Sequence, residues 1–179
     1  MMNNLTKFWL ISSVLTMFCT GCEQIEDDRL KNGLIYCSEG NPENFNPQTT
    51  TSRITLDASA HQIYDRLVER SASSDQLAPS LAESWTVSTD GKTIDIFLRK
   101  GVKFHQTRYF IPSQDLNADD VIFSFNRWRL NTHPFFASAD SYPHMQSYQL
   151  ELLIDRIEKV SSHHVRFILN QANHDFLPQ

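Results

Sequence analysis

Residues 78–127, APSLAESWTVSTDGKTIDIFLRKGVKFHQTRYFIPSQDLNADDVIFSFNR, decide the fold class of this chain. Near their start, two short runs rich in β-forming residues, Trp85–Ser88 and Thr93–Leu98, flank the dipeptide Asp90-Gly91. Asp-Gly between two such runs is a strong signal for a tight turn. We therefore predict an antiparallel hairpin over residues 85–98.

The same stretch ends in the strongest helix signal of the chain, over residues 117–130. Asn117 is a good N-cap, the Asp119-Asp120 pair falls in the first turn, and two arginines fall in the last turn. This placement explains both carboxylates as partners of the helix dipole, so they are not interpreted as a catalytic acid–base pair. The residues expected on the apolar face are Val121, Phe125 and Trp128.

Weaker patterns outside this stretch predict further elements. They are a buried strand at 34–37, a helix at 56–67 capped by Thr55, a short helix or turn at 77–84, an aromatic packed loop at 131–143 and a second hairpin at 157–169. Helices and hairpins alternate along the chain, so the expected fold class is mixed α/β.

The first 21 residues have the pattern of a signal peptide. A short n-region with Lys7 is followed by the apolar run 8–18, and these 11 residues rise only about 16 Å as a helix, too little to cross a bilayer. Cys22 follows Gly21 and is typical of a lipidated cysteine, although Cys19 stands where Leu is preferred. Ordinary cleaved secretion and an uncleaved anchor stay open as alternatives. Residues 22–32 are polar and charged and are expected to form a tether.

The charge balance argues against a nucleic-acid partner. The whole chain carries a formal net charge of −5, with 16 basic and 21 acidic residues. Removing Lys7 with the signal peptide lowers the charge to about −6, and no basic stripe suits nucleic acid. Cys37 would then be an unpaired thiol, buried as a small hydrophobe or available for pairing.

No catalytic or metal-binding pattern is present in the sequence. The seven histidines have no spacing typical of a metal site, and no serine lies in a nucleophile elbow. His163-His164 is interpreted as a solvated hairpin turn and His105 as a turn residue. We expect neither an enzyme nor a bound cofactor.

Several motifs in the same order resemble the peptide-type (family 5) solute-binding proteins of bacterial ABC importers. The matching segments are GLIYCSEG, QIYDRLVE, WTVSTDGKTIDIFLRKGVKFH and LNADDVIFSFNR, which together extend from Gly33 to about Leu177. The insertion HQTRYFIPSQ before the NADDV helix is similar to the Sap-type and the dipeptide- or haem-binding branches.

The resemblance implies a periplasmic receptor with a type II binding-protein fold. Residues 33–179 would supply the start of lobe I and most of the small extra domain, which leaves the fold incomplete, and Cys37 would be half of a lost disulfide. The receptor would capture peptides, antimicrobial peptides among them, or related ligands and deliver them to ABC permease subunits, and it would be held at the membrane by the lipid on Cys22. Within residues 48–53, Thr51, Ser52 and Arg53 are the candidate ligand-binding residues.

Family members are roughly three times this long, so the chain is expected to be a truncated form that binds no peptide tightly by itself. Two other interpretations stay open. One is a stand-alone envelope lipoprotein that contacts a partner through Tyr109, Phe110, Phe135 and Phe136. The other is an inactive product of a disrupted gene.

Overall fold

The computed structural model describes residues 35, 37–71, 73–173 and 175–177. The chain divides after Cys37, and the fold described below belongs to the second unit, which begins at Ser38. The predicted signal peptide, Cys22, the tether and most of the predicted strand 34–37 lie outside the described residues. The two described residues of that strand, Ile35 and Cys37, are exposed and belong to no strand.

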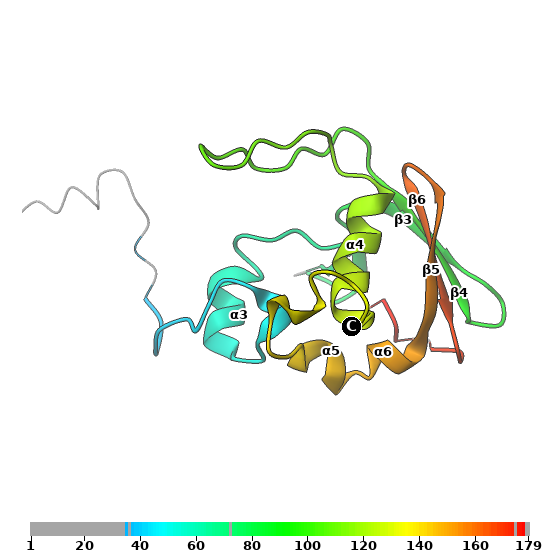
Figure 1. Ribbon diagram of the computed structural model, residues 1–179. Helices are drawn as coiled ribbons and strands as arrows, with labels where there is room; N and C mark the ends of the chain where they lie inside the picture. The colour runs from blue at the N-terminus through cyan, green and yellow to red at the C-terminus, as the bar shows by residue number, and fades with distance from the viewer. Residues whose placement is uncertain (1–34, 36, 72, 174, 178–179) are drawn as a thin grey trace, which may run out of the picture. The chain divides into compact units, whose positions relative to one another are not determined.

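The main sheet is built from the two predicted hairpins. Strands β3 (Ala82–Val87) and β4 (Thr93–Leu98) form the first, and β5 (Ile154–Ser161) and β6 (His164–Leu169) form the second. Antiparallel pairing of β4 with β6 joins them into a four-stranded sheet in the order β3-β4-β6-β5 (Figure 1). Both hairpin predictions are confirmed, although the second turn is tighter than expected because His164 already lies in β6.

The turn of the first hairpin explains why its sequence signal is strong. Gly91 has a φ of 68°, in the left-handed region that glycine adopts without steric cost. The Asp90 carboxylate accepts hydrogen bonds from the Ser88 hydroxyl at 2.5 Å and from the Lys92 amide at 3.1 Å. These two bonds lower the pKa of Asp90.

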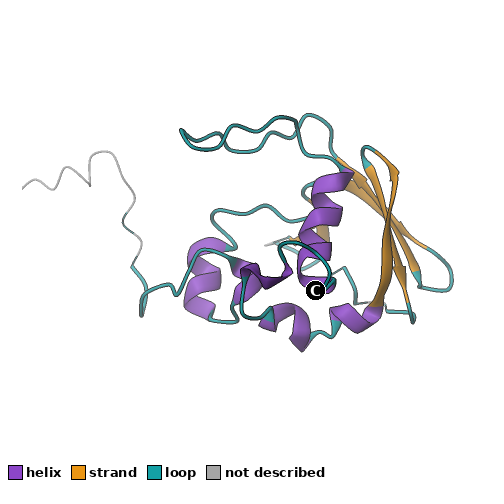
Figure 2. Cartoon of the chain, viewed as in Figure 1, coloured by secondary structure: helices purple, strands orange, loops and turns teal. Residues whose placement is uncertain are grey.

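One face of the sheet forms the hydrophobic core. In β4 and β6 every second residue is buried, and those residues belong to the same core cluster as residues of α4. The helices lie on one side of the sheet (Figure 2). Helix α4 (Ala118–Arg129) packs on β5 and β6 through Val121, Phe125 and Trp128. The buried sheet residues beneath it are Ile94, Ile96, Leu98, Ile154, Val165, Phe167 and Leu169.

Helix α4 confirms the predicted N-terminus. The Asn117 side chain accepts a hydrogen bond from the Asp119 amide at 2.8 Å, and Asp120 reaches back to the Asn117 amide at 2.9 Å. Asp119 also forms an exposed ion pair with Lys159 of β5 at 2.5 Å. The two carboxylates therefore have structural partners, as expected for the start of a helix.

Replacing the cap gives a direct test of this helix start. Asn117→Ala removes the acceptor for the Asp119 amide, so we expect the free energy of unfolding to fall by about 1 kcal/mol. Urea unfolding followed by circular dichroism measures the change. Asn41→Ala, at an exposed position with no hydrogen bond in the described part of the chain, is the matched control, and an equal effect of both variants would contradict the capping role.

Two sequence predictions are wrong in this region. Residues 77–84 contain no helix: β2 (Leu77–Pro79) pairs with β1 (Val68–Arg70) as a separate two-stranded sheet, and β3 follows. The predicted helix 56–67 is shorter and begins earlier, since α3 spans Arg53–Ser59; its N-cap residue is Ser52, and Thr55, the predicted cap, lies inside the helix. The carbonyls of Arg66 and Leu67 accept hydrogen bonds from residues 81 and 82, which requires extended backbone where the helix was expected.

The predicted loop 131–143 is packed, as expected, and it leads into short helices. The helices are η3 (Phe136–Ser138), α5 (Pro143–Ser147) and α6 (Leu150–Leu153). Tyr142, between η3 and α5, is only 3% exposed and belongs to the main core. This part of the chain forms the end of the core near the C-terminus of α4.

Candidate functional site

The segment before α3 is a rigid loop held by its own side chains. The Thr50 hydroxyl is buried, donates to Glu43 Oε2 at 2.9 Å and accepts a hydrogen bond from the Ser52 amide at 2.9 Å. The Glu43 amide donates to the Thr55 hydroxyl at 2.9 Å. These bonds fix the course of the chain from Glu43 to the first turn of α3.

Gln48 attaches this loop to helix α4. It lies in η2 (Pro47–Thr49), which also packs against α5. Its amide nitrogen donates to the Ser124 hydroxyl at 3.3 Å, and Arg127 donates to its amide oxygen. The loop is therefore held on the helical side of the core.

The three predicted ligand residues lie together at the start of α3. Thr51 is exposed, and Ser52 is the N-cap residue but forms no side-chain cap bond. The Arg53 side chain is 94% exposed and approaches Asp57 at 3.9 Å. Arg53 is therefore available to a carboxylate, whereas Gln48 and Thr50 are used in structural hydrogen bonds.

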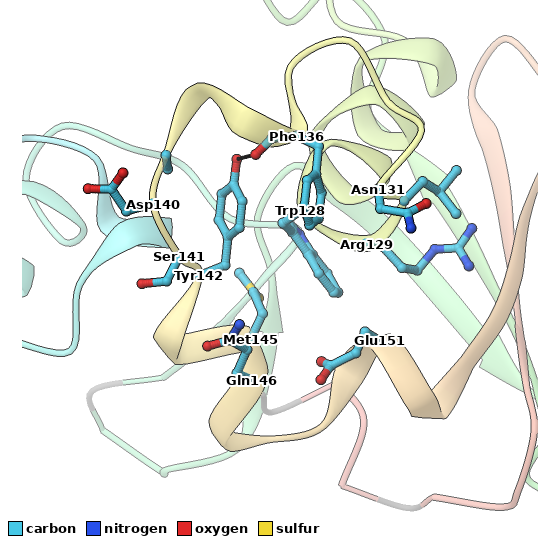
Figure 3. A pocket seen from close by; sticks show the side chains of 12 residues that line it. Trp128, Arg129, Asn131, Phe136, Asp140, Ser141, Tyr142, Met145, Gln146 and Glu151 are labelled. Carbon is cyan, nitrogen blue, oxygen red and sulfur yellow. Dashed lines mark hydrogen bonds between the residues drawn. The ribbon is translucent and has the colours of Figure 1, made fainter.

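A cavity of about 370 Å³ opens beside the C-terminal end of α4 (Figure 3). Its volume lies within the range usual for small-ligand sites. Trp128, Phe136, Tyr142 and Met145 supply large apolar side chains, and these come from α4, η3, α5 and the residue before α5. The remaining lining residues are Arg129, Leu130, Asn131, Ala139, Asp140, Ser141, Gln146 and Glu151.

The charged groups of the cavity differ in their availability. Arg129 is engaged: it donates to the Ile154 and Asp155 carbonyls and to the Asn126 side chain. Desolvation lowers the pKa of Arg129. Asp140 and Glu151 are exposed and form no ion pair with a described residue. In Figure 3 the Glu151 carboxylate lies on the same side as Trp128 and Met145, whereas the Asp140 carboxylate points away from them. The cavity thus offers one free carboxylate, that of Glu151, beside an apolar wall, a combination that suits an ammonium group carrying apolar substituents.

Trp128 of α4 is a buried residue in the lining of the cavity. Its side chain is 4% exposed, and the indole N–H has no hydrogen-bond partner among the described residues. The Tyr142 hydroxyl points to the carbonyls of Phe135 and Phe136, at 3.5 and 3.4 Å. Sequence analysis placed Trp128 only on a helix face and missed the cavity. The aromatic loop that follows α4 was the available signal.

The sequence also singled out four aromatic residues as exposed. Tyr109, Phe110 and Phe135 are 84%, 52% and 54% exposed. The prediction of an exposed side chain is wrong for Phe136, because this residue is partly buried and its ring packs on Tyr142 with a centroid distance of 6.3 Å. Three of the four therefore remain open to contact.

Other predicted sites have structural roles or lie outside the described residues. The Cys37 thiol is free and exposed, which contradicts the buried thiol, one of the two interpretations of this residue left open by the sequence. His164 is not in a solvated turn, because it is paired with Asp95 in the adjacent strand at 2.5 Å. Within the described ranges, no group of three metal-ligating residues occurs and no helix is long and apolar enough to span a bilayer.

Comparison with known proteins gives a consistent result. The family model described as bacterial extracellular solute-binding proteins, family 5 Middle, matches residues 76–179. The dipeptide-binding protein of Escherichia coli (strain K12) is 46% identical over 80% of this chain. The di/tripeptide-binding protein 2 of Pseudomonas aeruginosa is 47% identical over 80%, and the heme-binding protein A of Haemophilus influenzae is 40% identical over 82%.

Solved structures agree with these relatives. The dipeptide-binding protein from Pseudoalteromonas sp. SM9913, in complex with Met-Leu, is 46% identical with a TM-score of 0.78, covering 81% of this chain and 29% of its own. A periplasmic binding protein associated with an ABC transporter of Helicobacter pylori, in complex with the peptide STSA, is 32% identical with a TM-score of 0.71, covering 76% of this chain and 27% of its own. The chain spans about 27% of the length of the curated relatives named above.

Proposed function

Because the chain belongs to the family 5 bacterial extracellular solute-binding proteins, which are binding proteins and not enzymes, we propose that it acts in peptide capture for an ABC importer. In this role it binds a peptide or a related ligand in the periplasm and passes it to the permease subunits. The single observation that carries the proposal is the 46% identity, over 80% of this chain, with a dipeptide-binding protein. The hollow beside α4, with its apolar wall, is the candidate contact surface for a ligand.

Short peptides match the chemistry of this cavity. A peptide with a free N-terminus brings an ammonium group, which the Glu151 carboxylate can accept, and apolar side chains, which Trp128 and Met145 can contact. The two terminal guanidinium nitrogens of Arg129 already donate to the chain, and its Nε is buried without a partner among the described residues, so the peptide carboxylate is assigned to another cation. Antimicrobial peptides fall in the same chemical class as dipeptides.

The loop before α3 is the second proposed ligand-binding element. Thr51, Ser52 and Arg53 are assigned to it, with Arg53 as the group that meets a carboxylate because its side chain is 94% exposed. The rigid hydrogen bonding of Glu43 and Thr50 supports this role, because a fixed loop can offer its backbone to a ligand at low entropic cost.

The proposed cellular setting follows from the N-terminal sequence pattern. Residues 1–21 act as the signal peptide, Cys22 receives the lipid, residues 22–32 form the tether and residues 33–179 belong to the solute-binding domain. The protein is then a periplasmic lipoprotein at the cell envelope.

The exposed aromatic residues support a second candidate function. Tyr109, Phe110 and Phe135 offer apolar contact surface that a ligand in the cavity would not use. A stand-alone envelope lipoprotein that binds a protein partner would account for them. Such a protein would form a complex of defined stoichiometry without any effect of added peptides.

Nuclear magnetic resonance tests the peptide proposal at the cavity itself. We expect Met-Leu at millimolar concentration to shift the indole N–H signal of Trp128, which Trp128→Phe identifies. The affinity is expected to be weak, because the described cavity encloses a ligand only partly, whereas tight sites bury most of the ligand. The N-acetylated dipeptide, which lacks the ammonium group, should shift the signal about tenfold less at equal concentration.

Single variants identify the group that binds the ammonium. Glu151→Gln should weaken Met-Leu binding about tenfold, whereas Glu83→Gln, an exposed carboxylate outside the cavity lining, should leave it unchanged. The proposal fails if no peptide shifts the Trp128 signal, or if both variants behave alike.

A further inference from the structure

A long excursion of the chain projects from the body between β4 and α4. We call residues 102–116 the finger; it is the green loop that runs out and back above α4 in Figure 1. Its base is closed by a hydrogen bond from the Leu116 amide to the Val102 carbonyl at 2.8 Å. Its tip is closed by bonds between Thr107 and Phe110, at 2.9 and 3.4 Å, so that Arg108 and Tyr109 occupy the turn.

The tip of the finger exposes apolar side chains in sequence. Tyr109 is 84% exposed, Phe110 52% and Ile111 71%, and Phe104 lower on the finger is 40% exposed. A single exposed apolar residue is ordinary, but consecutive ones on a projecting element indicate a surface that contacts something.

The same region is a basic island on an acidic protein. Residues 99–115 contain four Lys or Arg residues and one Asp, a net charge of +3, so the rest of the chain carries −8 (−5 minus +3). Lys100, Lys103 and Arg108 form no ion pair with any described residue, and Arg99 donates only to the Ser80 carbonyl. These cations are therefore free to meet an anionic surface.

We propose that the finger docks on an anionic phospholipid surface. Tyr109, Phe110 and Ile111 enter the boundary between head groups and acyl chains, where aromatic side chains are favoured. Lys103 and Arg108 meet the lipid phosphates, and their aliphatic stems lie along the apolar layer.

A lipid surface suits these residues better than a protein surface does. Burying Lys103 and Arg108 against protein is costly unless carboxylates meet each of them. A bilayer supplies phosphates at any orientation and takes up the apolar tip without a shaped pocket. The small tip implies weak, reversible and salt-sensitive docking. It is independent of peptide binding, because the cavity lining contains no finger residue.

Hydrogen exchange of the full chain tests the docking. The chain is incorporated in vesicles of phosphatidylglycerol and phosphatidylcholine, or of phosphatidylcholine alone, at low and high salt. We expect amides 103–111 to be protected only with phosphatidylglycerol and low salt. The turn at residues 88–92, exposed except at Gly91, serves as the internal reference, and exchange in β4 and β6 reports that the chain stays folded.

Charge variants separate lipid docking from other causes of protection. Lys103→Gln with Arg108→Gln should weaken the lipid-dependent protection about 25-fold, since each basic residue near an anionic surface contributes roughly a factor of five. Arg70→Gln with Arg156→Gln changes the charge equally at two exposed positions outside the finger and should have little effect. The proposal would be overturned if exchange were equal in both kinds of vesicle, or if the two sets of charge variants gave the same protection. It would also be overturned if protection appeared only when permease protein is present.

Discussion

Phe167→Ala is expected to lower the free energy of unfolding by about 3–5 kcal/mol, the largest effect of any substitution considered for this chain. Phe167 is 0% exposed in β6. Its ring meets Phe125 of α4 edge-on at a centroid distance of 4.9 Å and Phe176 at 5.4 Å. Truncation therefore leaves a cavity between the sheet and α4 and removes two aromatic contacts. Equilibrium urea unfolding, followed by circular dichroism, measures the loss.

Phe110→Ala is the matched control for this experiment. Phe110 is 52% exposed on the finger and has no aromatic neighbour within the described residues, so the same truncation should change the free energy by less than about 0.5 kcal/mol. If the two variants are equally stable, the sheet–helix core is not the origin of stability.

The parts of the fold that were predicted correctly are determined by interactions between residues that are close together in the sequence. Asp90-Gly91 fixes a turn, Asn117 caps a helix, and alternation of Val165, Phe167 and Leu169 buries one face of a strand. Each of these signals is local, so it can be recognised without knowing which distant segments of the chain pack against it. Helix α4 and both hairpins follow from them.

The parts that were predicted wrongly depend on partners distant along the chain. Leu77–Pro79 is extended because it pairs with Val68–Arg70. The apolar period at 56–67 is helical in pattern, but Ile63 and Tyr64 are about half exposed, so no packing favours a longer helix. Tertiary hydrogen bonds decided these segments against local preference.

The cavity was not predicted from the sequence for the same reason, and the assignment of Thr51, Ser52 and Arg53 to a ligand stays a prediction. Thr51, Ser52 and Arg53 are adjacent in sequence and could be named together. The cavity instead is lined by residues from Trp128 to Glu151 that belong to α4, η3, α5, α6 and the segments between them, and no spacing in the sequence predicts that arrangement. The link from Gln48 to Arg127 is likewise visible only in the folded chain.

A hydrogen-bonded cluster lies on the opposite face of the sheet from the core. Asp95 of β4 accepts hydrogen bonds from His164 at 2.5 Å and from Arg166 at 2.8 and 3.2 Å, both in β6. The His164 ring also lies over Phe97 at a centroid distance of 4.4 Å. The Asp95 side chain is 17% exposed, so these bonds are partly shielded from water.

Asp95→Asn should destabilise the protein at neutral pH, by about 1–2 kcal/mol, because the three hydrogen bonds that the carboxylate accepts from His164 and Arg166 are weakened. Burial by itself would raise the pKa of Asp95, but the hydrogen bonds from Arg166 and His164 outweigh it and hold the pKa below the usual 3.8. A depressed pKa in the folded state stabilises the protein above the unfolded pKa and loses that contribution as the pH falls through the folded pKa. The difference in the free energy of unfolding between the unsubstituted protein and Asp95→Asn should therefore be largest at pH 6–7 and shrink below about pH 4.

Glu158→Gln supplies the contrast that isolates the partly buried cluster. Glu158 pairs with Arg156 at 2.8 Å, but both side chains are exposed, so water and salt screen the pair and no measurable loss is expected. Urea midpoints between pH 3 and pH 7 distinguish the two cases. If Asp95→Asn lost the same free energy at every pH, the cost would arise from packing of the amide, and ionisation of Asp95 would contribute nothing to the pairing of β4 with β6.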